Sequence, residues 1–259
     1  MTRKTGTREW SGSSCNIQFG CSNDCKYCYA KSQAIKNGIK TRSNWATEEF
    51  NEQAINKQYG LRGETKQPVM FPTTHDITNG NVLRCCDVLI KLLKSGNKVL
   101  IVSKPSHFNI AILCSTLRPY KDQILFRFTI CSADDKVLSF WEPGAPNIED
   151  RMKALKHAYM AGYETSVSCE PMLDDRIDKV VDLVKPYVSE TIWIGKMNKI
   201  DERLKTNGAN YETINRAAEL KAFQNDEAII SLYEKYKNDP FIKWKDSIQE
   251  VLEKCGYDQ

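Results

Sequence analysis

Strand-like and helix-like patterns alternate along residues 1–198, and this alternation limits the possible folds more than any other feature of the chain. Six short runs rich in β-branched and aromatic residues are predicted as strands, at 15–20, 68–73, 98–103, 123–131, 165–169 and 191–195. Amphipathic helical patterns lie between them, at 82–94, 147–161 and 177–185. A strand followed by a helix, repeated about six times, predicts a parallel sheet with right-handed crossovers. The predicted fold class is therefore α/β, as an open doubly wound sheet or as a barrel.

The sequence becomes more polar after Asn198. Residues 205–210, Lys-Thr-Asn-Gly-Ala-Asn, are predicted as a loop, and helical patterns follow at 211–237 and 241–254. We find no internal repeat and no low-complexity tract in the sequence. We therefore expect residues 1–198 to form the α/β unit and residues 199–259 to form a C-terminal helical extension of the same domain.

The composition excludes some classes of protein and leaves others open. With 41% hydrophobic residues, the 259-residue chain can bury a substantial core, so we do not expect disorder. The 37 basic and 33 acidic residues give a net charge of +4, which permits a polyanionic partner without requiring one. Residues 1–10 lack an apolar signal segment and no run of eighteen apolar residues occurs, so we expect no membrane span and a cytoplasmic location. In that compartment the ten cysteines are more often free thiols or metal ligands than disulfides.

Three cysteines, Cys21, Cys25 and Cys28, are spaced C-x3-C-x2-C directly after the first predicted strand. Three thiolates on one tight loop can bind three irons of a cubane cluster and leave the fourth iron open to an external chelating ligand. The alternative is a zinc site, which needs a fourth cysteine or histidine close by. None lies within forty residues downstream, although Cys15 lies six residues upstream. The spacing therefore favours an iron–sulfur cluster over zinc.

With the aromatic Tyr27 before its last cysteine, this motif is similar to the signature of the radical S-adenosylmethionine (SAM) superfamily. The resemblance implies a 4Fe-4S cluster whose open iron binds the amino and carboxylate groups of SAM. It further implies reductive cleavage of SAM to a 5'-deoxyadenosyl radical that abstracts hydrogen, with electrons from an external donor of the flavodoxin or ferredoxin type. The fold implied is a partial (β/α)6 TIM-like barrel, which agrees with the six predicted strands.

Over about residues 12–197 the chain resembles the spore photoproduct lyase and DNA repair photolyase-like branch of that superfamily. The resemblance is carried by segments 69–76 and 99–105 and by Glu142-Pro143, Ala145-Pro146, Arg151 and Gly162. One departure concerns the chemistry. Spore photoproduct lyase has a cysteine, just before the end of its second strand segment, that returns hydrogen to the product radical. This chain has Phe71-Pro72-Thr73 there instead.

Polar residues at the carboxyl ends of parallel strands face the ligand mouth of an α/β barrel. This rule makes five residues candidates for binding the cofactor: Thr73, Thr74, Asp76, Ser103 and Lys104. Lys104 is the best candidate for pairing with the carboxylate of SAM, as the resemblance also implies, and the alternative is a solvated loop lysine. The resemblance adds Tyr27, Glu142 and Arg151. For Arg151 a helix-surface salt bridge is an equal alternative, and Tyr27 either packs on adenine or fills the core.

Catalytic candidates follow from the same strand ends. Cys131 and Cys169 end the fourth and fifth predicted strands and are hydrogen donors if they face the mouth, although free cysteines are more often buried and inert. His75 lies beside Asp76 and is a candidate polar contact to the substrate.

Three functional hypotheses remain open. The leading one is a radical SAM enzyme that modifies or repairs a nucleobase in DNA, RNA or a nucleotide, for which the basic and aromatic segments 8–10 and 40–45 are candidate contacts. The second is a radical SAM enzyme acting on a small metabolite or a peptide; only Cys255 follows Cys169, which disfavours the peptide-maturing enzymes with extra clusters. The third is a non-catalytic, zinc-binding nucleic-acid module.

Overall fold

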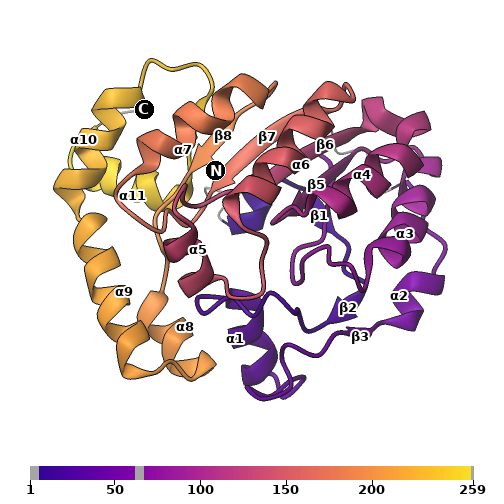
Figure 1. Cartoon of the computed structure of the whole chain (residues 1–259), viewed down its shortest axis with the longest axis horizontal. Helices are drawn as coiled ribbons and strands as arrows, with labels where there is room; N and C mark the ends of the chain where they lie inside the picture. The colour runs from indigo at the N-terminus through magenta and orange to yellow at the C-terminus, as the bar shows by residue number, and fades with distance from the viewer. Residues whose placement is uncertain (1–5, 62–66, 258–259) are drawn as a thin grey trace.

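A seven-stranded parallel sheet forms the centre of the molecule (Figure 1). The computed structural model describes residues 6–61 and 67–257. The strand order is β1-β4-β5-β6-β7-β8-β9, so neighbours in the sheet follow one another along the chain. The strands are β1 (Ser13–Ser14), β4 (Val69–Phe71), β5 (Val99–Ser103), β6 (Ile124–Thr129), β7 (Glu164–Cys169), β8 (Ile192–Ile194) and β9 (Ile242–Trp244). The predicted α/β fold, consistent with a partial TIM-like barrel, is confirmed.

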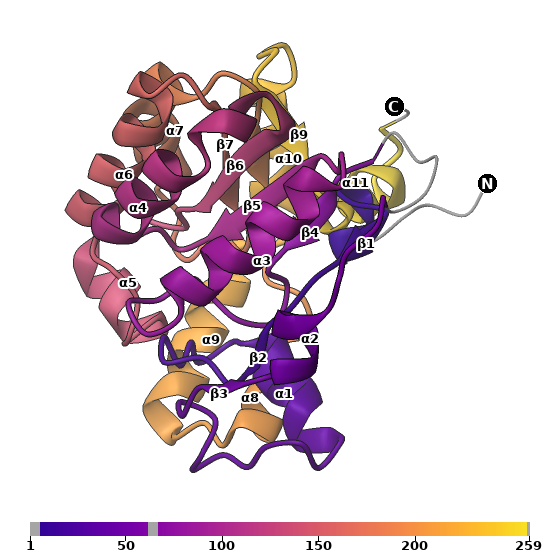
Figure 2. The ribbon, with the colours of Figure 1, turned by 90° about the vertical axis from the view of Figure 1, so that its right-hand side faces the viewer.

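Helices cover the outer side of this sheet, as Figures 1 and 2 show. They are α3 (Val82–Lys94), α4 (His107–Thr116), α6 (Ile148–Met160) and α7 (Ile177–Val184). Alternate strand residues such as Ile101, Phe126 and Val167 join Leu89 of α3 in the main hydrophobic cluster. The side chains between them point to the other face, because strand side chains alternate with a period of two. The outer face of the sheet is therefore the apolar core.

The inner face of the sheet is polar and aromatic. Arg127 of β6 lies in register with Ser166 of β7 and donates to its hydroxyl at 2.9 Å. The guanidinium also lies 5.4 Å from the ring of Trp193 on β8 and 4.7 Å from the ring of Trp10. The Trp10 side chain therefore fills the inner side of the curved sheet.

Trp10 reaches this position through the preceding 3-10 helix η1 (Gly6–Glu9), which is tied to the segment after β9. The amide of Gly6 donates to Asp246 at 3.1 Å, and the amide of Asp246 donates to Glu9 at 3.0 Å. The buried Lys245 ammonium donates to the Gly6 carbonyl at 3.0 Å and lies 4.1 Å from the Trp10 ring. These contacts connect the segment before β1 to the segment after β9, and β1 and β9 are the two edge strands of the sheet.

The predicted strand at 15–20 is confirmed only at residues 18 and 19, which lie in a separate two-stranded sheet and not in the main one. The chain instead forms β1, which pairs with β4, and a separate short strand β2 (Gln18–Phe19) that pairs antiparallel with β3 (Glu49–Phe50). Between them the amide of Cys15 still donates to the Met70 carbonyl of β4 at 3.0 Å, whereas the amide of Ile17 donates to a side chain, His75 Nε2, at 3.1 Å. The Asn16 carboxamide in turn accepts from the amides of Thr73 and Thr74. Strand pairing is therefore replaced here by bonds to the loop after β4.

The C-terminal segment also differs from the prediction. Helix α8 (Ile200–Asn207) covers part of the predicted loop, and the predicted helix 211–237 is divided into α9 (Tyr211–Phe223) and α10 (Asp226–Tyr236). The break comes at buried Gln224, which donates to Met172 O at 2.8 Å and accepts from the amide of Met197. The predicted helix 241–254 begins instead with β9 and continues as α11 (Asp246–Lys254). Residues 199–259 therefore contribute a strand to the sheet as well as helices.

Three further helices lie around the carboxyl ends of the strands: α1 (Tyr29–Lys36), α2 (Glu52–Asn56) and α5 (Asp135–Trp141). Helix α8 packs beside α1, as both Figure 1 and Figure 2 show. No helix within residues 6–61 and 67–257 has the length and apolar character needed to cross a membrane.

Candidate functional site

The loop that carries Cys21, Cys25 and Cys28 connects β2 to α1 and is shaped by two glycines. Gly20 has a φ of +83°, and a Cβ on it would lie 2.3 Å from the carbonyl oxygen of Thr47. A Cβ on Gly144 would lie 2.2 Å from the carbonyl oxygen of Ser22, which is inside the loop. Both distances are below any real contact, so only glycine permits this close approach of backbones.

Two hydrogen bonds from the C-terminal part of the chain hold the same loop. The side-chain amide of Asn207, at the end of α8, donates to the carbonyls of Lys26 and Cys28, each at 3.0 Å. The amide of Lys26 donates to the Trp141 carbonyl at 2.9 Å. The cysteine loop is therefore fixed by residues far from it in sequence.

All three cysteines line one cavity of about 500 Å³. Burial raises the pKa of each thiol, that of Cys21 to about 12. Thiols with raised pKa values become thiolates when a cationic metal centre replaces their protons. Three soft sulfur donors on one loop suit an iron–sulfur cluster, so these residues fit the cofactor that the motif implies.

The alternative zinc site gains no fourth ligand from Cys15. Its buried thiol lies 3.3 Å from the hydroxyl of Tyr59 and belongs to the main hydrophobic cluster, away from the cavity. Among the described residues, no three His, Cys, Asp or Glu side chains, the cysteines of the loop included, are grouped closely enough to hold a single metal ion. A cubane cluster differs in that each of its three thiolates binds a separate iron.

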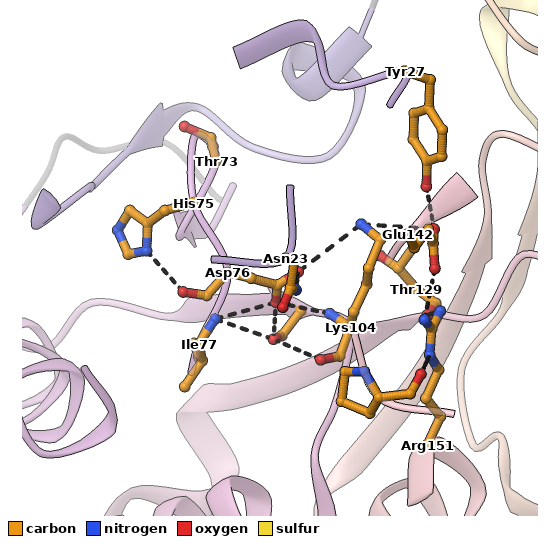
Figure 3. Close-up of polar contacts among 12 residues, drawn as sticks. Asn23, Tyr27, Thr73, His75, Asp76, Ile77, Lys104, Thr129, Glu142 and Arg151 are labelled. Carbon is orange, nitrogen blue, oxygen red and sulfur yellow. Dashed lines mark hydrogen bonds and ion pairs between the residues drawn. The ribbon is translucent and has the colours of Figure 1, made fainter. Parts of the chain in front are cut away.

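Asp76 connects the cysteine loop to the ends of β4 and β5 (Figure 3). Its carboxylate accepts from the side-chain amide of Asn23 at 2.9 Å and from the amides of Lys104 and Ile77 at 2.8 and 3.1 Å. The hydroxyl of Ser103 donates to it as well. Asp76 and Ser103 line the cavity as expected, but their polar atoms chiefly bond to each other and to neighbouring loops.

Lys104 lies between two carboxylates beside the cysteine loop (Figure 3). Its ammonium is 3.9 Å from Asp76 and 3.9 Å from Glu142. Burial alone would lower the pKa of Lys104, but the neighbouring Cys25, Glu142 and Asp76 raise it well above its ordinary value. The side chain therefore lines the cavity as a positive charge, because the neighbouring anionic groups stabilise its protonated form.

Glu142 and Arg151 form a buried ion pair behind Tyr27 (Figure 3). Arg151 donates to Glu142 at 2.6 Å, to Pro146 O at 2.7 Å and to Thr129 O at 3.3 Å. The Tyr27 hydroxyl donates to the other carboxylate oxygen of Glu142. Tyr27 lines the cavity, whereas Glu142 and Arg151 do not. The pair is therefore placed to orient Tyr27 rather than to touch a cofactor, and Arg151 is not on the helix surface.

The three residues after β4 all line the cavity. The hydroxyl of Thr73 accepts from Asn16 at 2.8 Å, and the carbonyl of Thr73 accepts from the hydroxyl of Tyr29. For Thr74 only the amide bond to Asn16 is seen in the described residues.

His75 has both ring nitrogens bonded to the backbone. Nε2 accepts from the amide of Ile17, which leaves the proton on Nδ1, 3.0 Å from the carbonyl of Asp76. Burial lowers the pKa of His75, so the ring is neutral. The suggested role as a substrate contact gives way to one in fixing the loop, because neither nitrogen is free.

Cys131 and Cys169 are fully buried and neither lines the cavity. Cys131 packs with Cys25, Tyr27 and Trp141, and Cys169 belongs to the main hydrophobic cluster. Burial raises the pKa of both thiols. The suggested role as hydrogen donors requires thiols that face the mouth, and these do not.

Several residues of the cavity were not predicted: Tyr29, Glu170, Lys196 and Arg203. Trp10 and Trp45, which also line it, belong to the segments 8–10 and 40–45 that were candidate nucleic-acid contacts. Glu170 and Lys196 follow β7 and β8, so the strand-end rule that identified Lys104 also applies to them. Arg203 lies on α8, for which the sequence pattern predicted no helix. No local signal pointed to it.

Comparisons with known proteins agree with this architecture. No protein-family model matches the chain. "Uncharacterized protein ORF301" of Acidianus two-tailed virus is 26% identical over 213 residues, which cover 77% of this chain and 69% of the viral protein.

Among solved structures, the chain resembles spore photoproduct lyase complexed with dinucleoside spore photoproduct, with a TM-score of 0.56 at 15% identity over 80% of this chain. The chain spans 63% of the length of that enzyme. It also resembles Streptococcus suis SuiB bound to S-adenosylmethionine, with a TM-score of 0.50 at 12% identity over 89% of this chain and 49% of SuiB. At these identities the likeness establishes the fold.

Proposed function

We propose that this chain, which shares its fold with the radical SAM enzymes spore photoproduct lyase and SuiB, is itself a radical SAM enzyme. One observation carries the proposal. Cys21, Cys25 and Cys28 line a single cavity together with the ammonium of Lys104, at the carboxyl ends of the parallel strands. Three thiols beside a fixed positive charge suit a cluster and the carboxylate of SAM.

When bound, a 4Fe-4S cluster supplies the electron that cleaves SAM and releases the 5'-deoxyadenosyl radical. In this proposal Cys21, Cys25 and Cys28 hold the cluster, and Lys104 binds the carboxylate of SAM. Tyr27 closes one wall of the cavity and is oriented from behind by the Glu142–Arg151 pair. The remaining cofactor contacts are assigned to the cavity residues Thr73, Thr74, Asp76 and Ser103.

We further propose that the substrate is a nucleobase in DNA, RNA or a nucleotide. The neighbouring spore photoproduct lyase was solved with a dinucleoside, and this chain carries a mildly positive charge. An external flavodoxin or ferredoxin would supply the electron. Ten free cysteines suit a reducing compartment such as the cytoplasm.

The test is to purify the protein without oxygen, reconstitute it with iron and sulfide, and record electron paramagnetic resonance spectra of the reduced form with and without SAM. We expect a cubane signal that shifts when SAM is added, together with release of 5'-deoxyadenosine. Cys25→Ala should lose both signals. Cys15→Ala is the matched control and should keep both, because its thiol lies outside the cavity. Zinc without iron, or a cluster that does not respond to SAM, would refute the proposal.

A further inference from the structure

The side of the cavity formed by the last strands of the sheet carries charges that the cofactor does not require. Glu170 follows β7, Lys196 follows β8, and Arg203 comes from α8. All three line the cavity that contains the cysteine thiols. A substrate must occupy this cavity beside the cofactor, so these groups, together with Arg8 of η1, are available to recognise it.

Arg203 is a partly buried cation without a close counterion. Burial lowers its pKa, and no carboxylate of the described residues lies within 4.0 Å of its guanidinium. Its nearest aromatic neighbour is the ring of Tyr29, at 5.9 Å. A guanidinium loses hydration on burial and is normally compensated by an oxyanion that accepts two of its hydrogen bonds. The position therefore suits an anionic group supplied by a ligand.

Glu170 faces this region and is held at a distance from Arg203. The two side chains feel each other's charge without forming an ion pair. Glu170 lies 3.4 Å from the ammonium of Lys245, which Glu9 also contacts, so two carboxylates share one buried cation. The charged and titratable groups near Glu170 are Lys245 and Asp246 beyond β9, Glu9 of η1, Arg203 of α8, Tyr29 of α1 and Lys196 on the same cavity wall.

We infer that Arg203 and Lys196 form a phosphate-binding subsite for the substrate, so that the cavity takes a phosphorylated nucleotide or a nucleic-acid strand rather than a free nucleoside. This inference rests on the proposed function and specifies its substrate. Arg203 supplies the planar pair of donors that suits a phosphate, and Lys196 adds a point charge. Glu170, on the same side of the cavity, sets the pH dependence of the subsite.

The direction of that dependence follows from the state of Glu170. Burial raises the pKa of its carboxyl to about 7, against the opposing effect of Lys245. Above that value a carboxylate shares the cavity with the phosphate and repels it. Below it the neutral acid does not. Phosphate affinity should therefore rise as the pH falls from 8 to 6, and Glu170→Gln should remove the dependence.

The experiment measures binding to the reconstituted protein through the fluorescence of the cavity tryptophans, Trp10 and Trp45. The ligands are a nucleoside, its 5'-monophosphate and the dinucleoside monophosphate, for each of the four DNA bases. The phosphodiester does not titrate between pH 6 and 8, so it is the probe for pH dependence. Variants are Arg203→Gln and Lys196→Gln. The control is Lys205→Gln, which removes one charge from the same helix outside the cavity.

We expect a phosphorylated ligand to bind at least about tenfold more tightly than the nucleoside, in the wild type and in the control. Arg203→Gln should abolish this preference, and Lys196→Gln should reduce it. Preference for the monophosphate would identify a free nucleotide as the substrate, and preference for the dinucleoside monophosphate would identify a strand.

Equal affinities for nucleoside and phosphorylated ligands would overturn the inference. So would an Arg203→Gln variant, folded by circular dichroism, that keeps the preference or that loses affinity for SAM instead. Release of 5'-deoxyadenosine is measured on the same samples. If SAM is not cleaved while the phosphate preference depends on Arg203, the proposed function fails and the subsite remains. If SAM is cleaved but no phosphate preference depends on Arg203, the proposed function stands and the subsite is refuted.

Discussion

Glu142 is fully buried and compensates the charge of a fully buried arginine. Replacing Glu142 with glutamine leaves the Arg151 guanidinium without a counterion. It also weakens the hydrogen bond that the Tyr27 hydroxyl donates to residue 142. We expect Glu142→Gln to lower the free energy of unfolding by about 3–5 kcal/mol. Urea denaturation of the metal-free protein measures this loss independently of the cofactor.

The control for Glu142 is Glu149→Gln on α6. Glu149 pairs with Lys153 one helical turn away, and both side chains are exposed. Exposed pairs of this kind contribute little to stability, because water and salt screen them. A loss in Glu142→Gln no larger than in this control would contradict the assignment of Glu142 as the counterion of Arg151.

Glu170 gives the protein a pH-dependent stability that differs in sign from that of most carboxylates. Its pKa in the folded protein is raised to about 7 from an ordinary value of 4.5. The folded state therefore binds the proton more tightly than the unfolded state, and the stabilisation present below pH 4.5 is lost as the pH rises through 7. Glu170→Gln should be more stable than the wild type at pH 8 and similar to it at pH 4.

Urea midpoints recorded between pH 4 and pH 8 test this prediction. The wild type should lose stability relative to Glu170→Gln across that window, and parallel curves would contradict it. Asp201→Asn is the control, because its carboxylate pairs with Lys221 at the surface of the molecule, and it should leave the curve unchanged.

At the level of single residues, the sequence predicted those parts of the site that depend on local spacing. The cysteine motif and the strand-end position of Lys104 are properties of short segments, so a pattern identifies them. Asn207 reaches the cysteine loop, and Arg203 reaches the cavity, only because α8 packs beside α1. A single sequence does not show which helices pack together. Strand β6 ends at Thr129, two residues before Cys131, and the Cys131 thiol is buried and does not line the cavity.

Among the elements, α8 has the clearest effect on the site, because it fixes the cysteine loop through Asn207. Asn207→Ala would leave two carbonyls of the loop without these donors, at a cost of about 1–3 kcal/mol for each buried group left unpaired. We expect less iron retained per chain after desalting of the reconstituted protein, with the fold unchanged by circular dichroism.

The matched control for this prediction is Thr206→Ala in the same turn of α8. Thr206 bonds to Glu202 within its own helix and is exposed. Its iron content should equal that of the wild type. If Asn207→Ala retained as much iron as the wild type, the loop would keep its shape without the two hydrogen bonds from Asn207.

The accuracy of the predicted elements followed the strength of their patterns. The strongly amphipathic α3 was predicted with its observed bounds, Val82–Lys94. Strand β9 has only three residues and lies next to a helical pattern, so its strand character was hidden. The segment 15–20 failed for a different reason, because side chains of the β4 loop take the place of a strand partner.

For the whole molecule, we propose that residues 1–198 and 199–259 form one domain, since β9 adds to the sheet and η1 bonds to the segment after it. Unfolding by urea should then be a single transition, with midpoints that agree between tryptophan fluorescence and circular dichroism. A separate transition for the C-terminal helices would contradict this.

A variant near the N-terminus, Trp10→Ala, tests the same proposal of a single domain. Trp10→Ala would empty the inner side of the sheet between Arg127 and Lys245 and should lower the free energy of unfolding by roughly 3 kcal/mol. Tyr211→Ala is the control, because the Tyr211 side chain is 79% exposed and its loss should change stability by less than about 0.5 kcal/mol. Chemical denaturation of both variants measures the difference.

The bond between Gly6 and Asp246 spans 240 residues, so the interior of the sheet cannot close before Asp246 has been synthesised. At a translation rate of about 5–20 residues per second, Asp246 is synthesised roughly 10–40 s after the cysteine loop. For most of that interval the loop with Cys21, Cys25 and Cys28 lacks the hydrogen bonds from Asn207 of α8, and throughout it the cavity is incomplete. If the proposed cluster is bound at these thiols, its stable insertion would follow the synthesis of Asp246, and oxidation of the thiols before that point would lower the fraction of chains that can be loaded.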